Sequence, residues 1–264
     1  MFSLFEKKPL LEEQSIAWMF DVFEWSLQNF GAEFFYQHTV LVLPNNDFFP
    51  GRVDSVQGMA ELIFSQVSRY AGIAHWPTMV VDQNSCALPN AANIKIIGDM
   101  REVGERRDLT TPESERLFIP FNPQQINNPE GMIATFAHII AHYMGQMAKQ
   151  SAPGGEDLWP HATEMTAIFL GFGLMFANSA YTFRGGCGSC YNPHANRDAY
   201  LTEQQSTYAL AIFSVLKGIP DATVSKQLKS HLRGFYKKAV KDVQQRSEQL
   251  ACLKRYSDQM MMAD

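Results

Sequence analysis

Cysteine and charge are both scarce in this chain of 264 residues. Its four cysteines are too few for a secreted fold held together by disulfides, so we expect reduced thiols. Charged residues make up 19% and apolar residues 46%, which excludes the disordered and fibrous classes. The composition therefore predicts a globular protein with a sizeable core.

Long apolar runs are also missing. The longest lies near residues 167–177, far short of the roughly 20 residues that span a bilayer. The N-terminal residues show no long apolar stretch and no Ala-x-Ala cleavage pattern, so we expect no secretory signal. These absences predict a cytoplasmic protein without a membrane partner.

The net charge of −5 is unevenly distributed along the chain. Residues 222–256 hold nine of the 22 basic residues but only two of the 27 acidic ones. We interpret this basic segment as a solvated helix face on an acidic body. Nucleic-acid binding is not expected, because the segment matches no recognised binding module.

Hydrophobic patterns divide the chain at residue 128. In residues 1–128 they predict helices at 12–30 and 55–70 and strands at 39–44, 78–82, 92–97 and 115–121. Pro129 suits a first helical turn, and the pattern then stays helical, with helices expected at 129–149, 157–179, 202–217 and 222–251. The sequence therefore predicts one α+β domain of residues 1–264, a small N-terminal sheet with helices followed by a mostly helical half (129–264).

The most informative feature lies in the first helix of the second half. His138 and His142 are four residues apart, so they lie on one face of a helix with Cβ atoms about 5–6 Å apart. They fall roughly opposite the apolar stripe of that helix, beside the small residues Ala134, Ala141 and Gly145, which leave room. Two imidazoles held in this way can bind one metal ion.

The following helix offers a third ligand. Glu164 comes twenty-two residues after His142, beyond a Pro-Gly-Gly loop that can reverse the chain. Two histidines and one glutamate, with water in the fourth position, are a known catalytic zinc set. The sequence therefore predicts a zinc site of His138, His142 and Glu164. For His161, one turn before Glu164, solvent exposure and a supporting or alternative ligand role both stay open.

Together these residues resemble the gluzincin branch of the zincins, to which thermolysin belongs. The resemblance covers about residues 129–180 and implies that His138, His142 and Glu164 are the zinc ligands. Residues 164–173 and 200–210 also resemble segments of uncharacterised bacterial zinc-peptidase-like proteins. The chain departs from the family pattern at Ile139, where zinc peptidases carry the glutamate that acts as general base.

Loss of that base predicts weak or absent peptidase activity, because general acid–base assistance contributes typically 10²–10⁴-fold to a rate. The leading hypothesis is a zincin-like, metal-binding protein whose peptidase activity is weakened or lost. One alternative is a metal-free interaction or regulatory protein on the same scaffold, with an unknown protein or peptide as partner. Another is an active metallohydrolase with a relocated base, such as Glu156 or His161.

A second candidate site lies in a Gly-rich loop. Cys187 and Cys190 form one Cys-x-x-Cys motif, and a structural zinc site normally needs two further ligands. A plain loop with reduced thiols, a small second metal site and a redox pair all stay open for these two residues.

Overall fold

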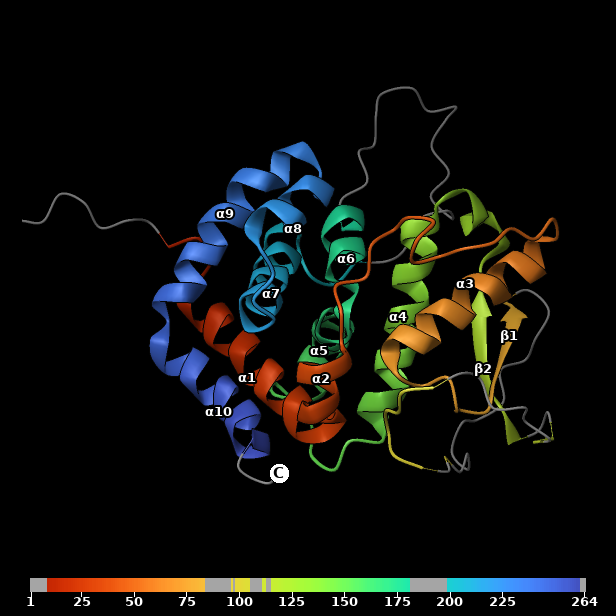
Figure 1. Cartoon of the computed structure of the whole chain (residues 1–264), viewed down its shortest axis with the longest axis horizontal. Helices are drawn as coiled ribbons and strands as arrows, with labels where there is room; N and C mark the ends of the chain where they lie inside the picture. The colour runs from red at the N-terminus through yellow and green to blue at the C-terminus, as the bar shows by residue number, and fades with distance from the viewer. Residues whose placement is uncertain are drawn as a thin grey trace, which may run out of the picture.

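In the part of the chain that the computed structural model describes, helices predominate and two short strands accompany them (Figure 1). The structure describes residues 9–83, 96, 98–104, 111–112, 115–180 and 199–261. In chain order the elements are α1 (Glu13–Phe30), α2 (Ala32–His38), α3 (Val56–Ala71), β1 (Thr78–Asp82), β2 (Leu117–Phe121), η2 (Pro123–Asn127), α4 (Pro129–Gln146), η3 (Glu156–Leu158), α5 (Trp159–Ala167), η4 (Ile168–Phe172), α6 (Gly173–Ser179), α7 (Glu203–Leu216), α8 (Asp221–Gln227), α9 (Ser230–Gln245) and α10 (Ser247–Met261).

The two strands form a small parallel sheet beside α3 and α4 (Figure 1). Thr78 pairs with Leu117 at one end and Asp82 pairs with Phe121 at the other. Pro120 is tolerated in β2 because each strand of a two-stranded sheet has a free edge. The sheet and its helical surroundings confirm the α+β class.

Helix α4 is packed on two sides. It contacts α3 and β2 on one side and α5 and α6 on the other (Figure 1). Phe136 and Ile140 are fully buried, and so are Ala134 and Ala141 on a different face. The hydroxyl of Tyr143 donates to the carbonyl oxygen of Phe118, 3.0 Å away, and joins α4 to β2. Two of the small residues beside the histidines, Ala134 and Ala141, therefore lie in the protein core.

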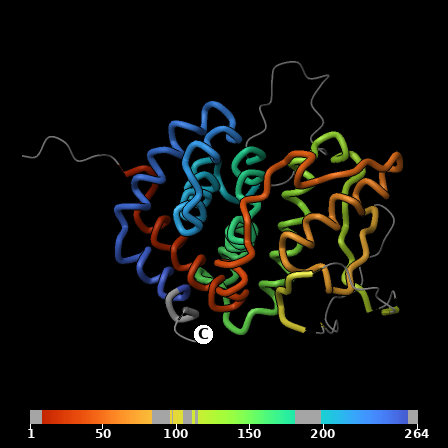
Figure 2. The backbone as a smooth tube through the Cα atoms, viewed as in Figure 1, coloured from red at the N-terminus to blue at the C-terminus, as the bar shows by residue number. Residues whose placement is uncertain are grey.

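The helical run from α5 to α6 is interrupted in its middle. Residues Ile168–Phe172 form a π-helical turn in which Gly171 has φ +104°, a conformation that favours glycine. The freed carbonyl oxygen of Gly171 accepts a hydrogen bond from the Val42 amide at 3.0 Å. Figure 2 follows this extended segment, residues 39–43, across the front of the α5–α6 run. A Cβ atom at Gly171 would collide with the Val40 carbonyl oxygen.

Most of the expected elements are confirmed. Helices 12–30, 55–70, 129–149 and 202–217 and strands 78–82 and 115–121 agree with the structure to within a few residues. The strand expected at 39–44 is wrong: this segment is extended but pairs with Gly171, so no strand ladder forms. The strand expected at 92–97 lies mostly outside the described residues. The sequence does not predict helix α2.

The basic segment is three helices where the sequence predicts one. The prediction of a continuous helix at 222–251 is wrong, because the chain is extended at Leu228 and leaves the helix again at Arg246. Leu228 is buried, and its ψ of 146° turns α9 so that Leu232 and Tyr236 pack inward against α7. Burial of this apolar face decides the helix breaks, not helix propensity.

A polar network ties the C-terminal helices to α1. The hydroxyl of Tyr208 on α7 donates to Asp242 on α9 at 2.5 Å, and Arg246 donates to the same carboxylate at 2.8 Å. Arg246 also forms an ion pair with Glu13 at the start of α1.

Among the residues that the structure describes, no helix has both the length and the apolar character needed to cross a bilayer.

Replacing Gly171 by alanine is expected to lower the free energy of unfolding by at least about 2 kcal/mol, because the substitution adds a clash to a strained conformation. Urea denaturation checks this. The control is Gly234→Ala on α9, where an added Cβ atom would have no neighbour within 4 Å; it should leave stability unchanged or raise it by about 0.5–1 kcal/mol. An equal loss of stability in both variants would contradict the role assigned to the contact between Gly171 and residues 39–43.

Candidate functional site

The two histidines of α4 lie one turn apart on the side that faces α5. Helix α4 begins at Pro129, and its N-terminus is capped by the Asn128 side chain, which accepts from the Gly131 amide at 3.1 Å. Helix α5 packs alongside α4. His138 and His142 are both half-buried at this helix pair. The sequence thus predicts correctly that these imidazoles share one face of one helix.

His142 is held by a tryptophan. The indole N–H of Trp159, the first residue of α5, donates to His142 Nδ1 at 3.2 Å. The indole also lies against Gly145, where a Cβ atom would collide with the ring. The room that Gly145 leaves on this face is therefore filled by Trp159.

This contact determines the tautomer of His142. An indole is a donor only, so Nδ1 carries no proton and the neutral ring carries its proton on Nε2. Burial also lowers the pKa of His142, which favours the neutral form. In metal sites the pattern is reversed, because the nitrogen that does not bind the metal donates to an acceptor.

Glu164 is fully buried on α5, and both of its carboxylate oxygens accept backbone hydrogen bonds. The amide of Tyr200 donates to Oε1 at 3.2 Å, and the amide of Leu201 donates to Oε2 at 2.8 Å. These two residues directly precede Thr202, the N-cap of α7, which forms a capping box with Gln205. Glu164 therefore fixes the point at which the chain enters α7.

Tyr200 lies next to histidines from both helices. Its ring stacks on His138 with centroids 5.9 Å apart and an interplanar angle of 16°. The ring of His161 on α5 meets Tyr200 edge-on at 6.1 Å. His161 is half-buried, and its Nδ1 is buried without a hydrogen-bond partner. Tyr200 thus touches one imidazole from α4 and one from α5.

In the observed arrangement these residues do not fit a zinc ion. The lone pair of neutral His142 is directed at Trp159, and both oxygens of Glu164 are directed at the chain before α7. Within the described residues, no group of three or more His, Cys, Asp or Glu side chains is placed to hold a metal ion. Zinc binding would require the Trp159 hydrogen bond to break.

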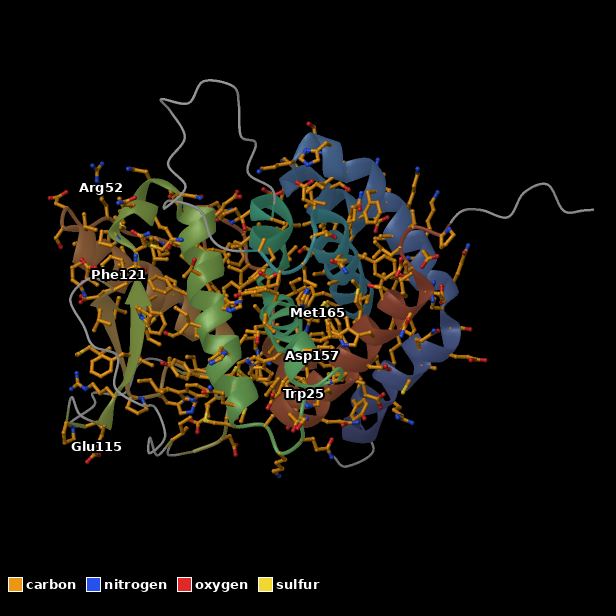
Figure 3. The ribbon with its side chains drawn as sticks, turned by 180° about the vertical axis from the view of Figure 1, so that it is seen from behind. Trp25, Arg52, Glu115, Phe121, Asp157 and Met165 are labelled. Atoms are coloured by element: carbon orange, nitrogen blue, oxygen red, sulfur yellow. The ribbon has the colours of Figure 1, made fainter. Side chains whose placement is uncertain are left out.

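The remaining candidate residues are spread around this helix pair. Ile139 is partly buried and packs against the hydrophobic core. Glu156 is exposed on η3, the turn that leads into α5. Figure 3 labels its neighbour Asp157 on this turn and Met165 further along the same helical run. Cys187 and Cys190 lie outside the described residues.

Sequence reasoning missed Trp159 and Tyr200 as parts of the site. One sequence feature could have indicated Trp159. This residue comes directly before Pro160, at the start of the helix that returns past the histidines, and its side chain is a large hydrogen-bond donor. Tyr200 is remote in sequence from both helices, so no local pattern indicates its position. Comparisons with protein-family models, curated proteins and solved structures found no match.

Glu164→Gln should lower the free energy of unfolding by about 1.5–3 kcal/mol, because an amide NH₂ would face a backbone N–H donor in a buried position. The matched control is Glu61→Gln, at an exposed carboxylate on α3 that accepts from Gln57 at 2.8 Å; there the change should stay below about 0.5 kcal/mol. Urea denaturation of both variants measures this. If Glu164→Gln proves as mild as its control, the carboxylate does not anchor α7.

The burial of His142 predicts a pH dependence. Because the pKa of His142 is lowered in the folded chain, the unfolded chain binds its proton first as the pH falls below about 6.5. The free energy of unfolding should therefore decrease as the pH falls through that range. His142→Gln keeps an acceptor for Trp159 but does not titrate.

Denaturation at about pH 7.5 and pH 5.5, values on either side of the ordinary histidine pKa, should show a smaller loss of stability in His142→Gln than in the wild type. We expect the difference to be at most about 1.5 kcal/mol, the net value of one hydrogen bond. Equal losses in the two proteins would show that His142 does not contribute to the pH dependence.

Proposed function

We propose that this chain is a non-catalytic interaction protein built on a zincin-like scaffold, in which the peptidase chemistry has been lost. One observation carries the proposal: the side chains that would bind zinc are engaged in joining α4, α5 and α7. His142 accepts from Trp159, and Glu164 accepts from the Tyr200 and Leu201 amides. In this role the same residues stabilise the fold.

The position of the missing base supports the same proposal. Ile139 contributes apolar surface to the core beside His138, so a glutamate there would face partial burial. The two candidate replacement bases lie in different environments. Glu156 is exposed on η3, and the ring of His161 is inclined at 63° to the Tyr200 ring, with centroids 6.1 Å apart. The proposal therefore assigns neither residue the role of a general base.

A partner, not a substrate, is therefore the expected ligand of this protein. We propose an unknown protein or peptide as that partner and the cytoplasm as its location. The single cysteine of the described residues, Cys252, is a free thiol, in keeping with a reducing compartment.

Zinc binding with weak residual hydrolysis is the second candidate. It is favoured by the unpartnered Nδ1 of His161 and by the contact of both His138 and His161 with one tyrosine ring. In this second candidate Trp159 would release His142, and the imidazoles of His138, His142 and His161 would serve as the ligands. In that case zinc would supply Lewis-acid polarisation and water activation.

Elemental analysis of protein purified without added metal separates the two candidates. We expect a zinc-to-protein ratio near zero that does not rise after incubation with zinc and gel filtration. A ratio near one, lost in His138→Ala, would favour the second candidate. Chelator-sensitive peptide hydrolysis that disappears in Glu156→Gln or His161→Ala would instead indicate an active hydrolase with a relocated base.

Restoring the glutamate is a sharper test. Ile139→Glu is expected to lower the free energy of unfolding by about 1–3 kcal/mol and to produce no hydrolysis of a broad peptide library. The matched control, Ile139→Gln, has the same size but cannot act as a base, so it should cost a similar amount. Chelator-sensitive hydrolysis by Ile139→Glu and not by Ile139→Gln would overturn the proposal.

A further inference from the structure

We propose that the outward face of α9 is a docking surface for an acidic polypeptide segment. This face, called the α9 basic face below, is formed by Lys237, Lys238 and Lys241 with Arg233 at its margin. The inference rests on the proposed function, because it names the chemistry of the partner that a non-catalytic interaction protein would bind.

Helix geometry separates the two faces of α9. Leu232, Tyr236, Ala239, Val240 and Val243 are buried, and they fall within one arc of the helix that packs on α7. The opposite arc is exposed and carries the basic residues between Ser230, Gly234, Gln244 and Gln245. No acidic residue lies on that arc.

The nearest acidic residue of α9 to these lysines already has other partners, although it follows Lys241 directly and lies one turn from Lys238. Asp242, the only acid of α9, lies at the flank and is engaged by Tyr208 and Arg246. Arg233 donates to the carbonyl oxygen of Leu228 at 2.9 Å, which fixes its guanidinium at the margin of the face. Throughout the described part of the chain, the ion pairs found involve His231, Arg246 and Arg255 and none of these lysines. The face therefore presents like charges that repel one another until an anion approaches.

Two features favour an acidic polypeptide over other anions. The large apolar side chains that are exposed in the described residues lie elsewhere, so α9 offers nothing to insert into a bilayer. The chain as a whole is acidic, at −5, so a long polyanion such as nucleic acid that extends past the α9 basic face would come within the Debye length of about 8–10 Å of acidic groups and be repelled there. A short acidic segment can contact the α9 basic face alone and avoid most of that repulsion.

The spacing on α9 also suits an extended peptide. Lys237 and Lys241 are four residues apart, so they are separated by about 6 Å along the helix axis. Alternate residues of an extended strand are about 6.6 Å apart and point to the same side. From Arg233 to Lys241 the α9 basic face extends over about 12 Å, which about four extended residues would match. A peptide of about eight residues would cover the whole of α9, whose 16 residues extend over about 24 Å.

The test is fluorescence anisotropy with a labelled peptide of about eight residues in which glutamate and threonine alternate, a length set by the span of α9. We expect binding at low salt that weakens as sodium chloride is added. The triple variant Lys237→Glu, Lys238→Glu and Lys241→Glu should weaken it at least about tenfold. Circular dichroism verifies that the variant is folded.

The control carries the same change of net charge at scattered exposed positions, Arg52→Glu, Lys149→Glu and Lys254→Glu. Arg52 lies at the opposite end of the molecule from α9 (Figure 3). The control should keep its affinity within about twofold, since distant exposed charges are screened. Equal weakening of both variants would overturn the proposal, because binding would then follow net charge alone.

Three further outcomes would also overturn it: no peptide binding at low salt, tighter binding of a labelled thymidine oligonucleotide, or tighter binding of phosphatidylserine vesicles.

The zinc content and peptide hydrolysis of the same preparation are measured in parallel. If the protein proves to be a zinc hydrolase yet binds the acidic peptide through α9, the proposed function fails and the docking surface stands. If it is metal-free and inert and does not bind the peptide, only the docking surface fails.

Discussion

The close approach of the segment 39–43 to Gly171 is the contact on which the two parts of the structure depend. It requires the α5–α6 run to open into a π turn, and it places the Val42 amide against the freed carbonyl oxygen. Arg101 extends the same junction, because its guanidinium donates to Thr39 Oγ1 and to the Ala71 carbonyl oxygen at the end of α3. Three hydrogen bonds thus link the segment 39–43, the end of α3 and the α5–α6 run, and they satisfy backbone groups at all three places.

Local sequence patterns predict the elements whose conformation depends least on contacts with distant parts of the chain. The strand at 78–82 and the helices at 12–30, 55–70 and 129–149 follow from periodicity and helix-start signals within each segment. The segment 39–44 has the composition of a strand, but its partner is a carbonyl oxygen 129 residues away, which no local pattern reveals. The break at Leu228 is equally hidden, because the residues around it favour a helix and only packing on α7 interrupts it.

The candidate site shows the same division between spacing and environment. That His138 and His142 share a face follows from spacing along one helix. The use of that face could not be predicted, because it depends on where Trp159 comes to lie and on the fit of its indole against Gly145. Glu164 is in the expected helix, but its partners come from the chain before α7. A motif thus specifies which groups are present, while the neighbouring elements decide which lone pairs are free.

The contact between Val42 and Gly171 also has a consequence for synthesis of the chain on the ribosome. Residues 39–43 emerge long before Gly171 has been made, so their binding position does not yet exist. Leu41 and Val42, both buried in the finished protein, then belong to an exposed apolar stretch of the kind that aggregates. This segment has to remain uncovered until α5 and α6 have been translated.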